Sequence, residues 1–183
     1  GVSPAFVERA SRELGARVKR SYGSTEAPTV ATPDATDPVE YDRDFDGRAV
    51  GGADLRVDPA HGELQVRGPE LFVGYVNPTD NEGAFTDDGW FRTGDIGELD
   101  ADGYLRLVGR ASDLIISGGY NVYPREVEDV LREHASVADV AVVGVPDATW
   151  GETVVAFVVP TEAAVFDAEV LAAHAAAGLA AYK

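Results

Sequence analysis

The sequence contains no cysteine, and only two of its 183 residues are lysine. Without cysteine the chain cannot form a disulfide, use a thiolate nucleophile or bind a metal through sulfur, so a metal ion would need oxygen or histidine ligands. No apolar run approaches the roughly 18 residues that a bilayer-spanning helix requires. Residues 1–14 include four charged side chains where a signal peptide would have an apolar core. These absences predict a cytoplasmic protein without a membrane span.

Positive charge is also scarce, because 15 Lys and Arg residues face 32 Asp and Glu residues and leave a net charge of −17. This balance argues against binding to nucleic acid or to an anionic membrane, since both need clustered cations. The three histidines are scattered and lack metal-ligand spacing. No Gly-x-Gly-x-x-Gly fingerprint and no nucleophile elbow is present, so oxidoreductase and hydrolase activities are disfavoured.

The first part of the chain predicts one helix followed by antiparallel strands. Residues 3–14 favour a helix because Ser3 can cap it and Pro4 suits its first position. Residues 16–22 predict a short strand, whereas residues 28–47, rich in proline and aspartate, predict an irregular loop. Strand-like alternation of apolar and polar residues begins at residue 53.

Further along, hairpins give way to a mixture of strands and helices. Asp102-Gly103 suits the tight turn of a hairpin between residues 96–99 and 104–108. Beyond residue 113 we expect strands at 114–116, 121–123, 139–145 and 153–159, and helices that begin at Pro124 and Asp167. The predicted fold class is therefore α+β, with a small antiparallel β-barrel or sheet followed by a smaller α/β domain.

Three short motifs carry the functional information. They are Tyr-Gly-Ser-Thr-Glu at residues 22–26, Phe-Arg-Thr-Gly-Asp at residues 91–95, and a longer stretch, residues 109–128, that contains Gly-Gly-Tyr-Asn-Val-Tyr-Pro. In this order they resemble the adenylate-forming (AMP-forming) acyl-CoA synthetases, and the resemblance covers nearly the whole chain. It implies an acyl-CoA synthetase-like fold whose small domain is mobile.

The resemblance assigns the first motif to a nucleotide. It implies that the ring of Tyr22 stacks on adenine, that Thr25 contacts phosphate and that Glu26 holds Mg²⁺, with Thr25 and Glu26 counted as catalytic. Gly23 lets the backbone approach the nucleotide closely, and a hard cation prefers carboxylate and phosphate oxygens. Taken by itself, the same string is typical of a solvated turn.

The second motif and Arg110 would complete this site. Asp95 matches the family's ribose-binding aspartate, although a turn-forming aspartate is the alternative. Arg110 matches the arginine that contacts ribose or phosphate, and its planar head with five donors suits that role; a surface arginine is the alternative.

The resemblance also predicts a hinge after Arg110, where the small domain pivots between adenylation and thioester formation. The family commonly has Asp or Lys at the pivot, whereas this sequence has Ser112 followed by Asp113, so both are candidates. Gly118 and Gly119 match the loop that lines the pantetheine tunnel of CoA, and a simple hairpin turn would need the same residues.

The domain boundaries that follow are 1–109 for the carboxy-terminal part of the large domain and 110–183 for an incomplete mobile small domain, with the hinge near 110–113. The family's phosphate loop is absent, and neither Lys19 nor Lys183 matches its adenylation lysine. We therefore expect the 183 residues to be a carboxy-terminal piece without ligase activity of its own.

The predicted activity is ATP-dependent activation of a carboxylic acid, favoured here as a fatty acid, to an acyl-adenylate, followed by thioester formation with CoA. The expected ligands are ATP or AMP, Mg²⁺, CoA and the acid. Two alternatives stay open: an adenylation domain that loads a carrier protein, and a noncatalytic nucleotide-binding or interaction fragment. Strands cut from a larger sheet could also pair between copies, so self-association is open as well.

Overall fold

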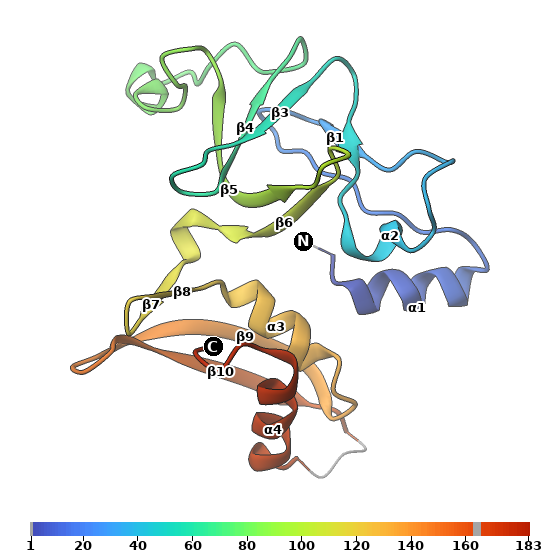
Figure 1. Ribbon diagram of the computed structural model, residues 1–183, viewed down its shortest axis with the longest axis vertical. Coiled ribbons are helices and arrows are strands. Elements are labelled where there is room, and N and C mark those ends of the chain that lie inside the picture. Colours follow the sequence, from blue (N-terminus) through green and yellow to red (C-terminus); the bar gives the residue numbers. More distant parts are fainter. Residues whose placement is uncertain (1, 163–165) are drawn as a thin grey trace. The chain divides into compact units, whose positions relative to one another are not determined.

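The computed structural model describes residues 2–162 and 166–183. The chain forms two compact units, Gly1–Ala111 and Ser112–Lys183, each with its own four-stranded antiparallel sheet (Figure 1). Each unit also has its own buried hydrophobic cluster. The predicted α+β fold class is confirmed. Among the helices of residues 2–162 and 166–183, none combines the length and the hydropathy that a membrane span needs.

The first unit begins with helix α1, Pro4–Leu14, as the sequence predicts. The Oγ atom of Ser3 accepts a hydrogen bond of 3.3 Å from the backbone N–H of Phe6, which satisfies one of the free donors at the helix start. The helix ends at Gly15, whose φ of 60° is left-handed. The strand predicted over residues 16–22 is wrong, because only Tyr22 pairs there, in an isolated bridge with Ala31.

A four-stranded antiparallel sheet forms the centre of the first unit. Its strands lie in the order β3 (Asp54–Val57), β4 (Glu63–Arg67), β5 (Phe91–Leu99) and β6 (Leu105–Arg110). The predicted hairpin turn joins β5 to β6, and Gly103 adopts a φ of 82° within it. The fully buried side chains of this sheet belong to Leu64, Val66 and Leu105.

The β5–β6 ladder contains an irregularity close to the end of β6. Asp95 is paired with Arg110 and Ile96 with Gly109, but Gly97 is paired with Leu107, so β6 has one extra residue at this point. Such a bulge bends a strand and turns the side chains that follow it. Arg110 therefore leaves the sheet in a direction that the bulge sets.

Trp90, just before β5, is enclosed by cations. The guanidinium carbon of Arg56 lies 4.4 Å from the centre of a Trp90 ring, and that of Arg67 lies 4.5 Å away. The side chain is only 8% exposed. Its burial between two guanidinium groups indicates that Trp90 packs rather than binds a ligand.

Residues 28–47 are more structured than their composition predicts. They contain the short strand β1 (Ala31–Thr32), which pairs with β2 (Arg48–Ala49), and the single-turn helix α2 (Tyr41–Asp44). We call residues 33–47 the acidic loop. Its fold depends on side-chain bonds to distant residues, which no local periodicity reveals.

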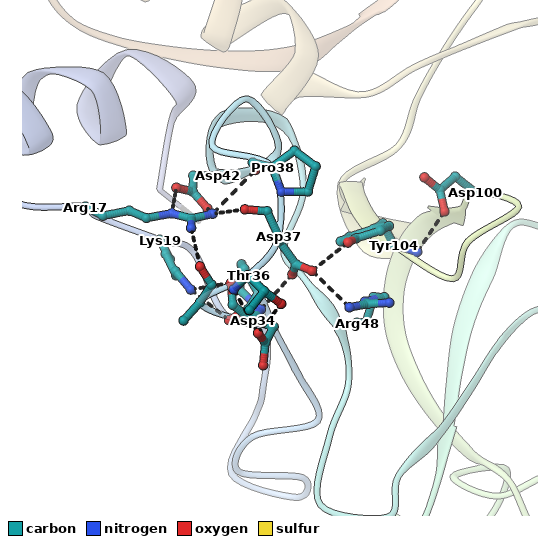
Figure 2. Close-up of polar contacts among 12 residues, drawn as sticks. Arg17, Lys19, Asp34, Thr36, Asp37, Pro38, Asp42, Arg48, Asp100 and Tyr104 are labelled. Atoms are coloured by element: carbon teal, nitrogen blue, oxygen red, sulfur yellow. Dashed lines mark hydrogen bonds and ion pairs between the residues drawn. The ribbon is translucent and has the colours of Figure 1, made fainter.

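Some of these bonds, drawn in Figure 2, attach the loop to the chain before it, to β2 and to the residue that precedes β6. The Arg17 guanidinium pairs with the Asp42 carboxylate, and one of its nitrogens donates to the backbone carbonyl of Asp37 at 2.8 Å. The carboxylate of Asp37 accepts from the Tyr104 hydroxyl at 2.7 Å and from Arg48 at 2.9 Å. The acidic loop is thereby attached to the residue that precedes β6.

This attachment predicts a dependence of stability on alkaline pH. The hydrogen bond to Asp37 raises the pKa of Tyr104 from 10.0 to about 12. Because the folded state holds this proton more tightly, its stabilising contribution is complete below pH 10.0 and is lost as the pH rises to about 12. We expect the free energy of unfolding, measured with urea, to fall over this interval, and to fall less steeply for Tyr104→Phe. Tyr104→Phe keeps the ring and removes only the titrating hydroxyl, so a slope equal to that of the unmodified chain would contradict the prediction.

The second unit has a sheet of order β8-β7-β10-β9 with two helices. Its elements are β7 (Ile115–Ser117), β8 (Tyr120–Val122), α3 (Pro124–Arg132), β9 (Val137–Asp147), β10 (Gly151–Pro160) and α4 (Ala168–Gly178). Both helices contribute to its buried core, which is made by Ile115, Val122, Val127, Leu131, Val137, Val140, Val142 and Leu171. The Asp167 side chain caps α4 by accepting from the backbone N–H groups of Glu169 and Val170.

Candidate functional site

Asp95 lies at the point where two other predicted site residues meet. Its Oδ2 atom accepts a hydrogen bond of 2.7 Å from the hydroxyl of Tyr22, and its Oδ1 atom accepts one of 3.0 Å from Nε of Arg110. The three side chains come from β5, from the end of β6 and from the segment that pairs with β1. The sequence separates Tyr22 and Asp95 by 73 positions, and the fold brings them into direct contact.

The turn that precedes Asp95 keeps its carboxylate in place. The Thr93 hydroxyl donates to the carbonyl of Leu64 at 2.7 Å and accepts from the backbone N–H of Asp95 at 3.0 Å. Gly94 between them has a φ of 71°, which a side chain would disfavour. The Thr-Gly-Asp order of the motif therefore has a structural cause.

The electrostatics of this cluster keep Asp95 available as an acceptor. Its residue exposure is 8%, and a buried carboxylate needs donors or a cation to compensate for lost water. Arg110 supplies the cation. Burial, and then the charge of Asp95, raise the pKa of Tyr22 well above its usual value, so its hydroxyl stays protonated and donates.

The two bonds leave acceptor capacity on Asp95. A carboxylate offers about four lone-pair positions, and Tyr22 and Arg110 use one on each oxygen. The remaining positions suit a pair of neighbouring hydroxyl groups on a ligand. Arg110, whose side chain is 63% exposed, also has donors that can reach a ligand.

The charge of Arg110 also acts on the carboxylate of Glu26. Its Oε1 atom accepts a hydrogen bond of 2.9 Å from the hydroxyl of Tyr75. A backbone hydrogen bond, the Tyr75 hydroxyl and the charge of Arg110, in decreasing order, act to lower the pKa of Glu26. Glu26 is thus held as an ionised carboxylate, which is the form that a hard cation requires.

Tyr75 is a residue that the sequence analysis missed. It comes from a long connection between β4 and β5, and its ring packs edge-on against Phe72, with centroids 4.8 Å apart. Phe72 also packs against Phe91 of the second motif, at 5.2 Å. An aromatic side chain in a connection has no helical or strand period to mark it, so only the fold reveals this contact with Glu26.

The donor set fits Mg²⁺ only if a ligand provides further oxygens. Within residues 2–162 and 166–183, no group of three or more His, Asp or Glu side chains could hold a metal ion. Glu26 offers a single carboxylate. Mg²⁺ commonly uses one or two carboxylates together with substrate phosphates and water, so one carboxylate beside a bound triphosphate is compatible with it.

Gly23 and Thr25 complete the first motif. A Cβ atom on Gly23 would lie 2.0 Å from the carbonyl oxygen of Pro28, so the turn itself requires glycine here. Ser24 closes the turn, since its N–H donates to the carbonyl of Ala27 at 2.8 Å. Thr25 is an exposed residue of this turn.

The four remaining predicted residues belong to the second unit. Ser112 and Asp113 lie in the short 3-10 turn Ala111–Asp113, where the Ser112 hydroxyl donates to Asp113 at 2.8 Å. Gly118 and Gly119 form the two-residue turn between β7 and β8, with φ values of 58° and 83°. Their hinge and tunnel roles stay predictions.

A cavity of about 520 Å³ in the first unit involves none of the predicted residues. It is lined by Arg56, Val57, Asp58, Pro59, Ala60, His61, Gln65, Thr86 and Arg92. Its two arginines are paired with Asp88 and Glu63 at 2.6 and 3.1 Å. Because none of the predicted site residues lines this cavity, the Asp95 cluster is the stronger candidate site.

Comparison with known proteins finds one matching family model and several similar proteins. Residues 126–183 match the model of the AMP-binding enzyme C-terminal domain. The chain is 42% identical over 173 residues to an indoleacetate–CoA ligase of Aromatoleum aromaticum, covering 88% of this chain and 34% of that protein. It is 48% identical over 123 residues to a long-chain-fatty-acid–CoA ligase of Bacillus subtilis, covering 67% of this chain and 22% of the relative.

Solved structures agree with the sequence comparisons. The ATP-bound RpMatB-BxBclM chimera B1 matches with a TM-score of 0.89 and 34% identity, over 99% of this chain and 38% of that one. The o-succinylbenzoate CoA synthetase of Bacillus subtilis, in complex with its acyl-adenylate intermediate, matches with a TM-score of 0.85 and 34% identity, over the same shares. The chain thus spans about a third of the length of most of these proteins.

Proposed function

We propose that the chain belongs to the adenylate-forming superfamily of AMP-binding enzymes and contributes the adenosine-binding part of an AMP-forming acid–CoA ligase, as its similarity to the family model and to CoA ligases supports. The observation that supports this most directly is the Asp95 carboxylate, held between Tyr22 and Arg110 with acceptor positions left over. Two adjacent ribose hydroxyls are the ligand groups that such a carboxylate would accept.

The proposed reaction has two steps. A carboxylate oxygen of the acid attacks the α-phosphorus of ATP, and pyrophosphate leaves with the electrons of the broken P–O bond. The sulfur of CoA then attacks the acyl carbonyl and gives up its proton, and AMP leaves. Both steps bring anions together, so positioning and charge neutralisation provide most of the catalysis.

The residues of this chain have separate tasks in that scheme. Asp95 fixes the ribose, Tyr22 contributes to the adenosine site, and Arg110 offsets negative charge at the ribose or phosphate. Thr25 donates to phosphate, and Glu26 would hold Mg²⁺. When bound, the ion neutralises phosphate charge.

We further propose that residues 1–109 correspond to the end of a large domain and residues 110–183 to a mobile small domain. Ser112 and Asp113 would provide the hinge, and Gly118 and Gly119 would line the path of the pantetheine arm of CoA. The proposed acid is a fatty acid, supported by relatives named for long-chain fatty acids at 48% and 37% identity. Relatives named for indoleacetate and 2-succinylbenzoate support an aromatic acid as the second candidate.

Calorimetric titration of the chain with AMP tests the proposed site. We expect Arg110→Met to weaken AMP binding about tenfold, because a hydrogen bond to a charged group contributes about 1.5 kcal/mol or more. Arg106→Met is the matched control. Arg106 lies exposed on the same strand, and its substitution removes the same charge. Equal affinities for the two variants, or no binding by the unmodified chain, would contradict the proposal.

A further inference from the structure

The outer edge of β6 is not left open to solvent. In the four-stranded sheet, β6 pairs with β5 on one side only. On its other side, the N–H of Asp46 donates to the carbonyl of Leu105 at 2.7 Å, and the N–H of Leu105 donates to the carbonyl of Gly47 at 2.8 Å. The end of the acidic loop therefore occupies the edge of the strand that leads to Arg110.

The Asp46 side chain extends this contact along β6. Its Oδ2 atom accepts from the backbone N–H of Leu107 at 3.0 Å. Leu107 is the residue at which the β5–β6 bulge begins, three positions before Arg110. A bond at this point fixes the strand where its pairing changes, and hence the direction in which Arg110 emerges.

The other oxygen of the Asp46 carboxylate faces the segment that leads to Tyr22. Oδ1 of Asp46 lies 3.4 Å from Nε of Arg20, and both side chains are only 6% exposed. Arg20 stands two residues before Tyr22 and also donates to the carbonyl of Phe45 at 3.4 Å. One buried carboxylate thus joins the segment that ends in Tyr22 to the strand that ends in Arg110.

We propose that Asp46 is a positioning residue, which sets the places of Tyr22 and Arg110 on the two oxygens of Asp95. This inference deepens the proposed function, because it rests on the same adenosine site. Asp46 touches none of the predicted ligand groups, and it acts only through Arg20 and Leu107.

A buried ion pair alone would not require this role. Replacing such a pair by apolar groups is often neutral for stability, whereas removal of one partner leaves an uncompensated charge. Here the carboxylate also accepts a backbone donor at the bulge, so its position links two specific segments. The expected signature is a displaced site in a chain that is still folded.

The experiment compares Asp46→Ala and Asp46→Asn with Asp44→Asn in the 183-residue chain. Asp44 lies in the same loop, and its side chain is 46% exposed beside Arg43, so its substitution removes an equal charge without touching β6. Nitrogen-15 NMR would follow the Nε–H of Arg110 and the amide of Leu107, urea unfolding would measure stability, and titration would measure AMP affinity.

We expect Asp46→Ala to move the Arg110 Nε–H signal toward that of a solvent-exposed arginine and to weaken AMP binding about tenfold. Asp46→Asn keeps an oxygen that Leu107 can use but loses the charge that faces Arg20, so we expect an intermediate change of about threefold. Asp44→Asn should change neither the spectrum of the site nor the affinity.

The outcomes separate three cases. If the Asp46 variants lose stability while the Arg110 signal and the AMP affinity of the folded chain stay as before, Asp46 is merely structural and the inference fails. If Asp46→Ala does not fold, the same readouts are taken from Asp46→Asn: a moved Arg110 signal supports the positioning role, and an unmoved one contradicts it. If the Arg110 signal moves although the unmodified chain binds no AMP, the positioning role stands and the proposed function fails.

Discussion

Asp95→Ala should lower the rate of acyl-adenylate formation about a thousandfold. The variant would lose both hydrogen bonds that the proposed ribose hydroxyls donate to the charged carboxylate, at about 2 kcal/mol each. The assay needs a complete ligase, so the variant would be made in a chimera in which these 183 residues replace the corresponding third of a relative. ATP–pyrophosphate exchange measures the step directly. The substitution also removes the partner of Tyr22 and Arg110, which adds to the loss.

Two further variants show whether a loss of activity comes from the missing charge of Asp95. Asp95→Asn keeps the size of the side chain but not its charge, so its activity separates shape from electrostatics. Asp102→Ala changes an exposed aspartate at the far end of the same hairpin and should retain full activity. If the Asp95→Ala chimera is folded by circular dichroism and as active as the Asp102→Ala chimera, Asp95 has no part in nucleotide binding.

Gly23→Ala should destabilise the first unit by about 3 kcal/mol or more, since overpacking of this severity cannot be relieved by a rotamer change. The new Cβ atom would lie 2.0 Å from the carbonyl oxygen of Pro28, which is backbone and cannot rotate away. Tyr22 immediately precedes Gly23, so the displaced turn should also disturb the bond to Asp95. Urea unfolding measures the loss.

Gly103→Ala provides the comparison for that experiment. Gly103 has a φ of 82° but nothing within 4 Å of an added Cβ atom, so it tests backbone strain without steric overlap. We expect a cost of about 1 kcal/mol for this variant. Equal losses for the two variants would show that overlap with Pro28 does not explain the glycine at position 23.

The parts of the fold that sequence could predict are those with a local physical signal. Helix α1 has a capping serine and a proline at its first position, and the β5–β6 hairpin has an Asp-Gly turn. The Gly-Gly turn between β7 and β8 follows the same logic, because both residues have positive φ. In each case a few neighbouring residues determine the conformation.

The acidic loop could not be predicted in this way. Its shape depends on bonds between residues far apart in sequence, such as Arg17 with Asp42 and Asp37 with Tyr104, which are separated by 25 and 67 positions. The strand expected over residues 16–22 failed for a related reason, since this segment is held by side-chain bonds of Arg17 and Arg20 rather than by a ladder.

The candidate site was found by motif, and its internal geometry was not. The resemblance named Tyr22, Asp95 and Arg110, but a sequence does not reveal that the first and the last share the carboxylate of the second. Tyr75 and Asp46 carry no motif at all. Their roles follow only from a hydroxyl at 2.9 Å from Glu26 and from a carboxylate between two segments.

The sequence has two tryptophans, and each unit contains one of them. Trp90 is enclosed by two guanidinium groups and is 8% exposed, whereas Trp150 of the second unit is 58% exposed. Fluorescence emission shifts to longer wavelength when an indole enters water. Unfolding of the first unit should therefore shift the emission of Trp90, whereas the emission of the already hydrated Trp150 should change little. The protein therefore carries its own label for following the unit that contains Asp95.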